Sequence, residues 1–357
     1  MKDFFSNLVR NTTALINRLI RLYHPQTLRE KGWIWASGLG IVTLVVILFL
    51  VGTYWSIEPD PFNVRDNTRN RLAELNLEPV TGSYTTATLL SVMETLLDKP
   101  GGYLSNDVMP PSIFLDNIPN WEFGVLTQSR DLARSLRNDM SRSQSQSLEN
   151  KDLAITEPQF NYSNDSWIFP STEGEYRQGI EALQRYLTDL TQRGKENTQF
   201  FARADNLRDW LAIIEKRLGS LSQRLSASVG QERVNTDLAG DPEAAQSTTS
   251  PDHVAVQTPW LEIDDVFYEA RGSTWALIQF LYAVEIDFQD ILKKKNALVS
   301  LRQIIRELEA TQDSIISPVV LNGGGFGIFA NYSLVMASYI SRANAAVIDM
   351  RNLLSQG

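Results

Sequence analysis

The chain has 357 residues, a formal net charge of −9 and 43% hydrophobic residues, which is the composition of a globular protein. It has no cysteine and only two histidines, His24 and His253. These counts exclude disulfide frameworks, thiolate metal sites and cysteine nucleophiles, and they argue against multi-histidine metal sites and Ser-His-Asp triads. The negative charge argues against nucleic acid as a partner. We therefore predict no catalytic, cofactor-binding or metal-binding residues.

Residues 33–55 (WIWASGLGIVTLVVILFLVGTYW) contain no charged side chain. As a helix they extend about 35 Å, which is enough to cross the hydrocarbon core of a bilayer. Trp33 and Trp35 lie at one end and Tyr54 and Trp55 at the other, as is typical of membrane–water interfaces. The segment predicts a transmembrane helix with these four residues at the membrane interface. The alternatives are a buried core helix, which rarely runs this long without charge, and a cleaved signal peptide, which ends in small residues.

The charge on either side of this segment predicts its orientation. Residues 1–32 carry six basic and two acidic side chains, so the rest of the chain has a net charge of −13. Basic flanks stay in the cytoplasm, although Arg65, Arg69 and Arg71 weaken the bias here. We expect a single-pass protein of a bacterial inner membrane, with the lipid bilayer as one partner, a cytoplasmic N-terminus and a periplasmic bulk.

The regions before and after the span have different character. Residues 1–32 are predicted as a cytoplasmic segment whose first 24 residues form an amphipathic helix with a basic face. That helix either lies on the inner leaflet, packs on a cytoplasmic partner, or is a passive extension. Residues 56–63 are a proline-containing linker, and residues 64–357 are predicted as a periplasmic helical domain.

Heptad spacing dominates this domain. Apolar residues recur at alternating intervals of three and four over 180–190, 204–225 and 267–291, as in coiled coils and helical bundles. The last two tracts flank residues 228–258, which are predicted as a mobile surface loop. The predicted fold is all-α, with an N-terminal transmembrane helix and an elongated helical bundle. In this bundle the two tracts form a long antiparallel coiled-coil-like hairpin, and a final helix over 326–354 packs along it.

The irregular segment 103–122 is the first candidate site. A long loop in a helical domain is often functional, and this one could bind a partner or glycan through polar and aromatic side chains. The candidates are Asn106, Asp107, Asp116, Asn117, Trp121 and Glu122. Alternatively the segment is an Ω-like loop whose apolar residues cap the end of the bundle. Glu122 is also considered as a general acid for sugar cleavage, although no motif for that chemistry surrounds it.

Two further motifs have simpler structural explanations. Residues 323–330 (GGGFGIFA) are formally a variant dinucleotide fingerprint, but no βαβ unit surrounds them, so a turn that begins the last helix is favoured. The second motif is a group of acidic residues that could bind calcium or act as an acid–base pair. The group consists of Glu262, Asp264, Asp265 and Glu269. The favoured explanation is that Asp264 or Asp265 caps the N-terminus of a helix, with the other acids in its first turn.

Five stretches of the sequence resemble a known family: 96–111, 115–126, 170–183, 264–277 and 331–354. They are similar to an uncharacterised bacterial domain-of-unknown-function family (DUF family 2333) of single-pass inner-membrane proteins. The resemblance covers almost the whole chain. It implies a location in the bacterial envelope, and it implies no activity, cofactor or catalytic residue.

The function expected from these features is that of a membrane-anchored periplasmic scaffold or adaptor of the cell envelope. It would act through helical packing surfaces on an envelope protein or on a second copy of the chain, and enzymatic activity is not favoured. One alternative is a periplasmic enzyme that acts on cell-wall glycan through carboxylates. A second alternative is a transmembrane helical sensor that relays a signal to residues 1–24.

Overall fold

The structure is a computed structural model that describes residues 17, 21–143, 148–192, 198–234, 253–315, 317, 319–325 and 327–356. The chain divides into two compact units, Met1–Tyr54 and Trp55–Gly357. We call the second of these the helical unit. Most of the amphipathic helix predicted within residues 1–24 lies outside the described residues, as does Phe326, where the last helix was predicted to begin.

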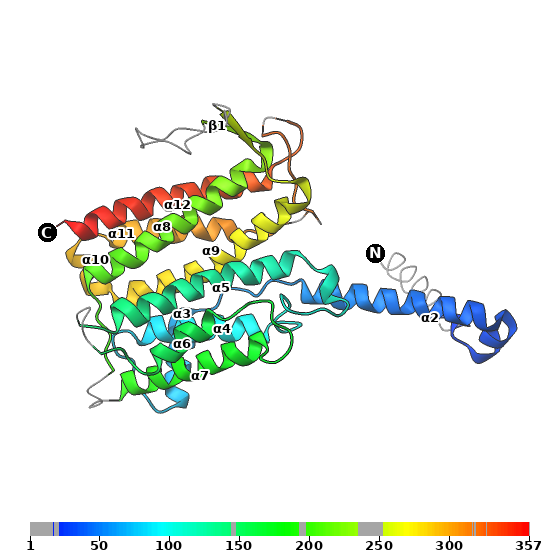
Figure 1. The fold of residues 1–357 in the computed structure, drawn as a ribbon, viewed down its shortest axis with the longest axis horizontal. Coiled ribbons are helices and arrows are strands. Elements are labelled where there is room, and N and C mark those ends of the chain that lie inside the picture. Colours follow the sequence, from blue (N-terminus) through cyan, green and yellow to red (C-terminus); the bar gives the residue numbers. More distant parts are fainter. Residues whose placement is uncertain are drawn as a thin grey trace, which may run out of the picture. The chain divides into compact units, whose positions relative to one another are not determined.

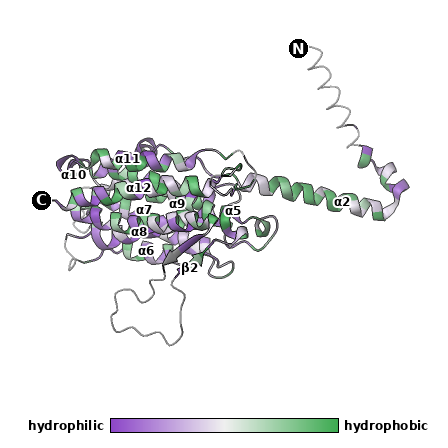
Figure 2. Ribbon diagram, turned by 90° about the horizontal axis from the view of Figure 1, so that it is seen from above, coloured by the Kyte–Doolittle hydropathy of each residue, from purple (hydrophilic) through white to green (hydrophobic). Residues whose placement is uncertain are grey.

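The N-terminal unit contains most of helix α2, Pro25–Trp55. Gly32 interrupts this helix with φ of 83° and ψ of 172°, so the uncharged stretch begins directly after the break. Figure 2 shows this stretch as a predominantly hydrophobic helix. In the described part of the chain, α2 alone is long and apolar enough to cross a membrane, and none of its most apolar window is buried in the protein. The prediction of one long apolar helix is thus confirmed.

The helical unit consists mainly of helices (Figure 1). The α-helices are α3 (Val64–Glu74), α4 (Ser83–Asp98), α5 (Asn117–Ser135), α6 (Leu153–Phe160), α7 (Thr172–Thr191), α8 (Ala204–Ser226), α9 (Ile263–Asp287), α10 (Gln289–Lys294), α11 (Leu298–Glu309) and α12 (Tyr332–Ser355). Short 3-10 turns occupy Ser112–Phe114, Ala227–Val229, Trp260–Glu262 and Ala310–Gln312, and a π-helical turn, Leu136–Met140, follows α5. The prediction of a mainly helical fold is confirmed.

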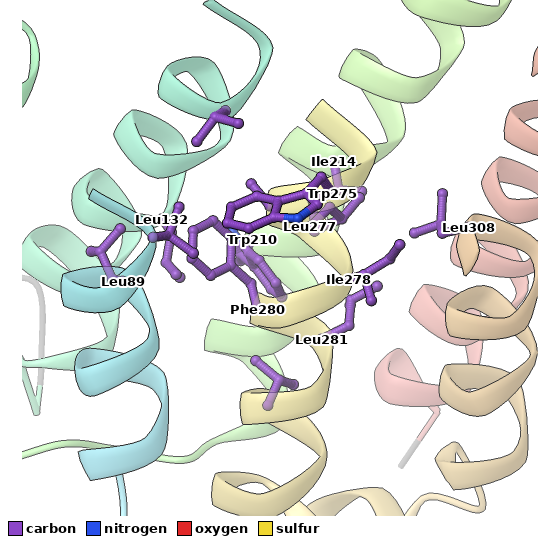
Figure 3. Packing of buried hydrophobic residues seen from close by; sticks show 14 of the residues in the cluster. Leu89, Leu132, Trp210, Ile214, Trp275, Leu277, Ile278, Phe280, Leu281 and Leu308 are labelled. Carbon is purple, nitrogen blue, oxygen red and sulfur yellow. The ribbon is translucent and has the colours of Figure 1, made fainter. Parts of the chain in front are cut away.

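Helices α5 and α9 form the centre of this unit. Helices α8, α11 and α12 lie on one side of the pair, and α4, α6 and α7 lie on the other (Figure 1). The buried side chains of α9 meet both sides, and Figure 3 shows Trp275 and its neighbours between Leu89 of α4 and Leu308 of α11. One continuous hydrophobic core therefore joins the layers.

The α5–α9 contact is close because two glycines lie in it. A Cβ atom on Gly272 would overlap the carbonyl oxygen of Trp121, and one on Gly124 would overlap the carbonyl oxygen of Glu269. The two helices run in the same direction, since Asn120 bonds to Asp265 and Gln128, farther along α5, bonds to Ser273. Backbones can approach this closely only where side chains are absent.

The heptad tracts are helices, but their main partners differ from the predicted hairpin. Helix α8 packs chiefly on α12, and α9 packs chiefly on α5, although α8 and α9 also touch. Helices α8 and α12 are antiparallel, with Ser222 and Ser341 hydroxyls 2.5 Å apart and an ion pair between Glu215 and Arg351. Heptad spacing marks which face of a helix is apolar, but it does not specify which neighbour covers that face.

A small sheet lies where a surface loop was predicted over 228–258. Strands β1 (Gln231–Val234) and β2 (His253–Val256) pair antiparallel, with Gln231 opposite Val256. Residues 235–252 lie outside the described part of the chain. The strands are only four residues long, too short for their pattern to stand out in the sequence.

The predicted linker 56–63 is non-helical, and it lies along α9. The guanidinium of Arg271, whose side chain is only 8% exposed, donates to the Glu58 carboxylate at 2.7 Å. It also donates to the carbonyl oxygens of Thr311 and Asp313 at 3.1 and 2.9 Å. Farther along, the ring of Phe62 meets that of Trp275 edge-on. The connection that follows α2 is therefore fixed to the central helix of the helical unit.

Candidate functional site

One end of the helical unit gathers most of the candidate residues. Trp55 packs there beside Gly101 and Leu104. Helices α5 and α9 begin at this end, α4 and α8 end there, and α12 starts beside the end of α8 (Figure 1). We call it the Trp55 end, and we call the opposite end, where α9 and α12 finish, the far end.

A buried ion pair holds the base of the 103–122 segment at the Trp55 end. The Lys99 ammonium lies 2.6 Å from the Glu122 carboxylate, and both side chains are completely buried. Glu122 also accepts hydrogen bonds from the backbone N–H groups of Leu104 and Ser105 at 2.9 and 2.8 Å. Burial raises the pKa of Glu122, while the charge of Lys99 lowers it. Glu122 thus ties the loop to α4 and α5, and it does not face solvent as a general acid would.

The other candidates in this segment do not form one exposed surface. Trp121 is buried, with its ring centroid 5.2 Å from that of Trp275. Asn106 is buried and donates to the Ser166 carbonyl oxygen and to Glu173, both at 2.9 Å. Asp107 and Asp116 are exposed, whereas Asn117 is half-buried; the Asp116 carboxylate accepts from the Asn117 N–H at the start of α5. Three of the six candidates therefore act inside the fold.

The apolar residues of the same segment divide between the core, where Tyr103, Leu104 and Ile118 are buried, and the surface. Phe114 is 75% exposed and Met109 is 71% exposed, and Val108 and Ile113 are exposed beside them. The predicted alternative of an Ω-like loop that caps the bundle therefore fails for Met109, Ile113 and Phe114, whereas Leu115 does pack against the core.

The acidic group at the start of α9 is partly buried. Asp264 and Asp265 lie in the first turn of α9, and Glu262 occupies the N-cap position without a side-chain cap bond. None of these side chains forms the predicted cap bond. Asp264 and Asp265 only place negative charge near the helix N-terminus, where acidic groups are favourable. Burial, helped by the carboxylates of Asp264, Asp116 and Glu262, raises the pKa of Asp265 to about 6. Among the described residues, no group of acidic or histidine side chains has an arrangement that could hold a metal ion.

Residues 322–323 and 330–331 close a turn before α12. The Gly323 N–H donates to the Ala330 carbonyl oxygen at 2.9 Å, and Asn322 pairs with Asn331. Helix α12 starts at Tyr332, later than predicted, because the side chain of Asn331 caps it through the Leu334 N–H at 2.8 Å. Ile328 and Phe329 are exposed at the tip of this turn.

A groove of about 380 Å³ lies between α5, α8 and α9. Its charged lining is largely paired: Arg217 bonds to Asp131 at 2.7 Å, and Arg224 forms an ion pair with Glu269. These pairs join α8 to the two central helices, so the charges of the groove serve the packing of the bundle.

The structure is that of a mainly helical protein in which one long apolar helix precedes a helical bundle. Residues 28–357 match a family described as an uncharacterized protein conserved in bacteria (DUF2333), so the chain belongs to that family. Neither the curated proteins nor the solved structures contain a match to the chain.

Proposed function

We propose that the protein is a membrane-anchored scaffold or adaptor of the bacterial cell envelope. Residues 33–55 hold it in the inner membrane, the N-terminus lies in the cytoplasm, and the helical unit lies in the periplasm. The observation that carries the proposal is the uncovered apolar surface of α2, none of whose most apolar window is buried. Apolar surface in water is unfavourable by about 25 cal/mol per Å², and a bilayer removes that cost.

The way in which α2 continues into the helical unit supports a role as an anchor. Trp55 packs beside Gly101, and Arg271 binds Glu58 only three residues farther on. A buried, multiply bonded arginine holds its partner segment in one geometry. The segment that directly follows the anchor is thus part of the helical unit and not a free tether.

Single-cysteine labelling tests the anchor and its orientation, because the chain has no cysteine of its own. Thr27→Cys lies before the apolar stretch, and Leu148→Cys replaces an exposed residue of the helical unit. With a membrane-impermeant maleimide on spheroplasts, we expect Leu148→Cys to react and Thr27→Cys to react only after permeabilisation. Release of the labelled protein into the soluble fraction, or the reverse labelling pattern, would contradict the proposal.

The scaffold role is tested through the outer faces of the helices. Photo-crosslinking residues placed on the exposed side of α12, such as Val335 and Ile348, should trap a defined envelope protein or a second copy in native membranes. Positions on the buried side, such as Ile340, serve as matched controls that should trap only neighbouring parts of the same chain. Equal patterns from both faces would speak against a docking surface on this helix.

One observation favours an enzymatic alternative. Asp265, with its pKa raised to about 6, lies near Asp116 and Glu262, and such a partly buried carboxylate can exchange protons near neutral pH. If the protein cleaves glycan through this group, Asp116→Asn, Glu262→Gln and Asp265→Asn together should abolish the envelope phenotype while the fold persists. A scaffold should tolerate the triple substitution. Glu122 is unsuitable for this comparison because its carboxylate is bonded to Lys99 inside the fold.

A further inference from the structure

Large apolar side chains are exposed on four separate loops of the helical unit. Phe169 and Ile328 are each 99% exposed, and Trp260 is 79% exposed. The exposed apolar residues of these loops, which we call the end loops, are Val108, Met109, Ile113 and Phe114; Trp167, Ile168 and Phe169; Trp260 and Leu261; and Ile328 and Phe329. Isolated exposed apolar residues are ordinary, but a gathering of this size marks a contact surface.

All four loops belong to the Trp55 end, as the bonds between them show. Asn106, just before the first loop, bonds to Ser166, which precedes the second. Asn120 of α5 bonds to Asp265 just beyond the third loop. The fourth loop is reached through Ser228, whose carbonyl oxygen accepts from Asn322, and Thr258 bonds to the adjoining Ala227. The end loops come from distant parts of the sequence, and the fold brings them to one end (Figure 1).

That end is also where the chain passes into α2. Trp55 is the last residue of α2, and its ring packs beside Gly101 and Leu104, close to the first of the end loops. If α2 crosses a bilayer, covalent connection alone keeps the Trp55 end within reach of the lipid surface. Tryptophan and phenylalanine are the side chains that favour the headgroup region, and isoleucine, leucine and methionine extend into its apolar side.

We propose that the end loops form a second, peripheral contact with the bilayer, in which their apolar side chains enter the leaflet next to the helical unit. The inference deepens the proposed membrane anchoring by α2 and rests on it. The lipid is expected to be zwitterionic, because Asp107, Asp116 and Glu262 lie among the loops and anionic headgroups would repel them. The contact would fix how the helical unit stands on the membrane, since a single helix leaves tilt and rotation free.

A surface for a second copy or for another protein is the competing occupant. Lipid is favoured because the loops lie at the end of the helical unit from which the chain leaves for an apolar helix, and because their side chains are of the kind that partitions into interfaces. At the far end, Leu148 and Val299 are exposed on the described surface, and they provide matched positions that the proposal leaves in water.

Depth-dependent quenching in the full-length protein tests the proposal. Single cysteines replace Phe114, Phe169 or Ile328 at the end loops, Leu148 or Val299 at the far end, and Leu44 in α2. All of these are exposed residues, so their replacement leaves the core intact. Each variant is labelled with a small fluorophore and reconstituted into phosphatidylcholine nanodiscs that carry a nitroxide either near the headgroup or near the chain terminus. Circular dichroism confirms the helical fold of each variant.

We expect the end-loop labels to shift to shorter emission wavelengths and to lose most of their intensity with the headgroup-level nitroxide, and much less with the deeper one. The far-end labels should be unaffected, and the Leu44 label should be quenched by the deeper nitroxide. If the Leu44 label is quenched while the end-loop labels behave as the far-end labels do, the anchor stands and the peripheral contact is wrong. If the Leu44 label is not quenched, the anchor itself fails. Energy transfer between end-loop labels of two copies, without lipid quenching, would assign the surface to a dimer and overturn the proposal.

Discussion

Helices α2 and α9 are both long and rich in apolar residues, but they differ in how far the rest of the protein covers their apolar side chains. The apolar stretch of α2 carries no charge, and none of its most apolar window is buried in the protein. Helix α9 is buried over most of its length and still carries Arg271 and Asp287. A helix in a protein core can therefore carry charged side chains, because neighbouring segments supply ion-pair and hydrogen-bond partners for them.

Each buried charge of α9 does have such partners. Asp287 accepts from the N–H groups of Gly82 and Thr85, at 2.8 and 2.7 Å, and so caps the start of α4. The pKa of Asp287 is raised to about 6, because the effect of burial outweighs that of these bonds, which lower it. Arg271 binds Glu58 and two backbone carbonyl groups. A bilayer offers no such partners, which agrees with the absence of charge from residues 33–55.

The largest effect is expected from breaking the buried pair in the helical unit. Lys99→Met leaves the Glu122 carboxylate buried without its counter-charge, which should lower the free energy of unfolding by about 3–5 kcal/mol. Adding Glu122→Gln should recover part of the loss, because the amide oxygen still accepts from the Leu104 N–H and carries no charge. Urea denaturation followed by circular dichroism measures both.

The control for this prediction is an exposed ion pair at the same end. Arg177 and Asp98 lie 2.8 Å apart with more than half of each side chain exposed. Arg177→Met should cost about 1 kcal/mol or less, because water screens the pair. Equal losses for Lys99→Met and Arg177→Met would show that the Lys99–Glu122 pair does not hold the loop as described.

A charge in the middle of α2 should separate anchoring from folding. Val45→Arg should reduce membrane insertion by about 3 kcal/mol, because an arginine at the centre of a span costs about that much to insert. The helical unit should melt unchanged, since residue 45 belongs to the other compact unit. Membrane fractionation and thermal melting measure the two effects, with Val45→Leu as the control. A fully membrane-bound Val45→Arg protein would argue against α2 as the span.

A substitution in the α5–α9 contact should have the opposite effect, lowering the stability of the fold while leaving membrane anchoring intact. Gly272→Ala places a Cβ against the Trp121 carbonyl oxygen and should destabilise the helical unit by about 2 kcal/mol without releasing the protein from membranes. Gly219→Ala is the matched control, because its Cβ would be 3.6 Å from the Asn344 amide nitrogen, an ordinary contact. There alanine should stabilise α8 by up to about 1 kcal/mol. A similar result for both variants would mean that α5 and α9 are not in close contact.

The sequence predicts the helices better than their arrangement. The uncharged run from 33 to 55 ends at Trp55, where α2 ends, and the first two heptad tracts lie in helices α7 and α8. The tract over 267–291 is divided at Phe288 between α9 and α10. The pairing of α5 with α9 was not predicted, because it depends on Gly124 and Gly272. A glycine inside a helical pattern indicates a close approach, but it does not identify the approaching segment.

The candidate site was predicted less well, because burial decides the role of each residue. Glu122 and Asn106 look like polar loop residues in the sequence, yet they are buried by segments 166–173 and 99–105. Phe114 looks like a core residue, yet it is exposed. The sequence does not tell whether a polar residue among apolar ones is buried or exposed, because that depends on partners that lie tens of residues away in the chain.

The smallest effect, and the one that tests the acidic group beside the end loops, is the pH dependence of Asp265. Because its pKa in the folded protein is raised from 3.8 to about 6, the folded state binds more protons than the unfolded state between these values. Stability therefore falls as pH rises from about 4 to 6. Asp265→Asn keeps an acceptor for the Asn120 amide and removes this slope, so it should stabilise the protein above pH 6 and change little near pH 4. We expect a gain of about 1 kcal/mol or less at neutral pH, since the carboxylate is partly solvated.

Melting temperatures measured from pH 4 to 8 test this prediction. Asp66→Asn, which replaces an exposed acid in the first turn of α3, is the control that should leave the slope in place. If the wild-type and Asp265→Asn curves run parallel, the carboxylate of Asp265 is freely hydrated and its pKa is not raised by the fold.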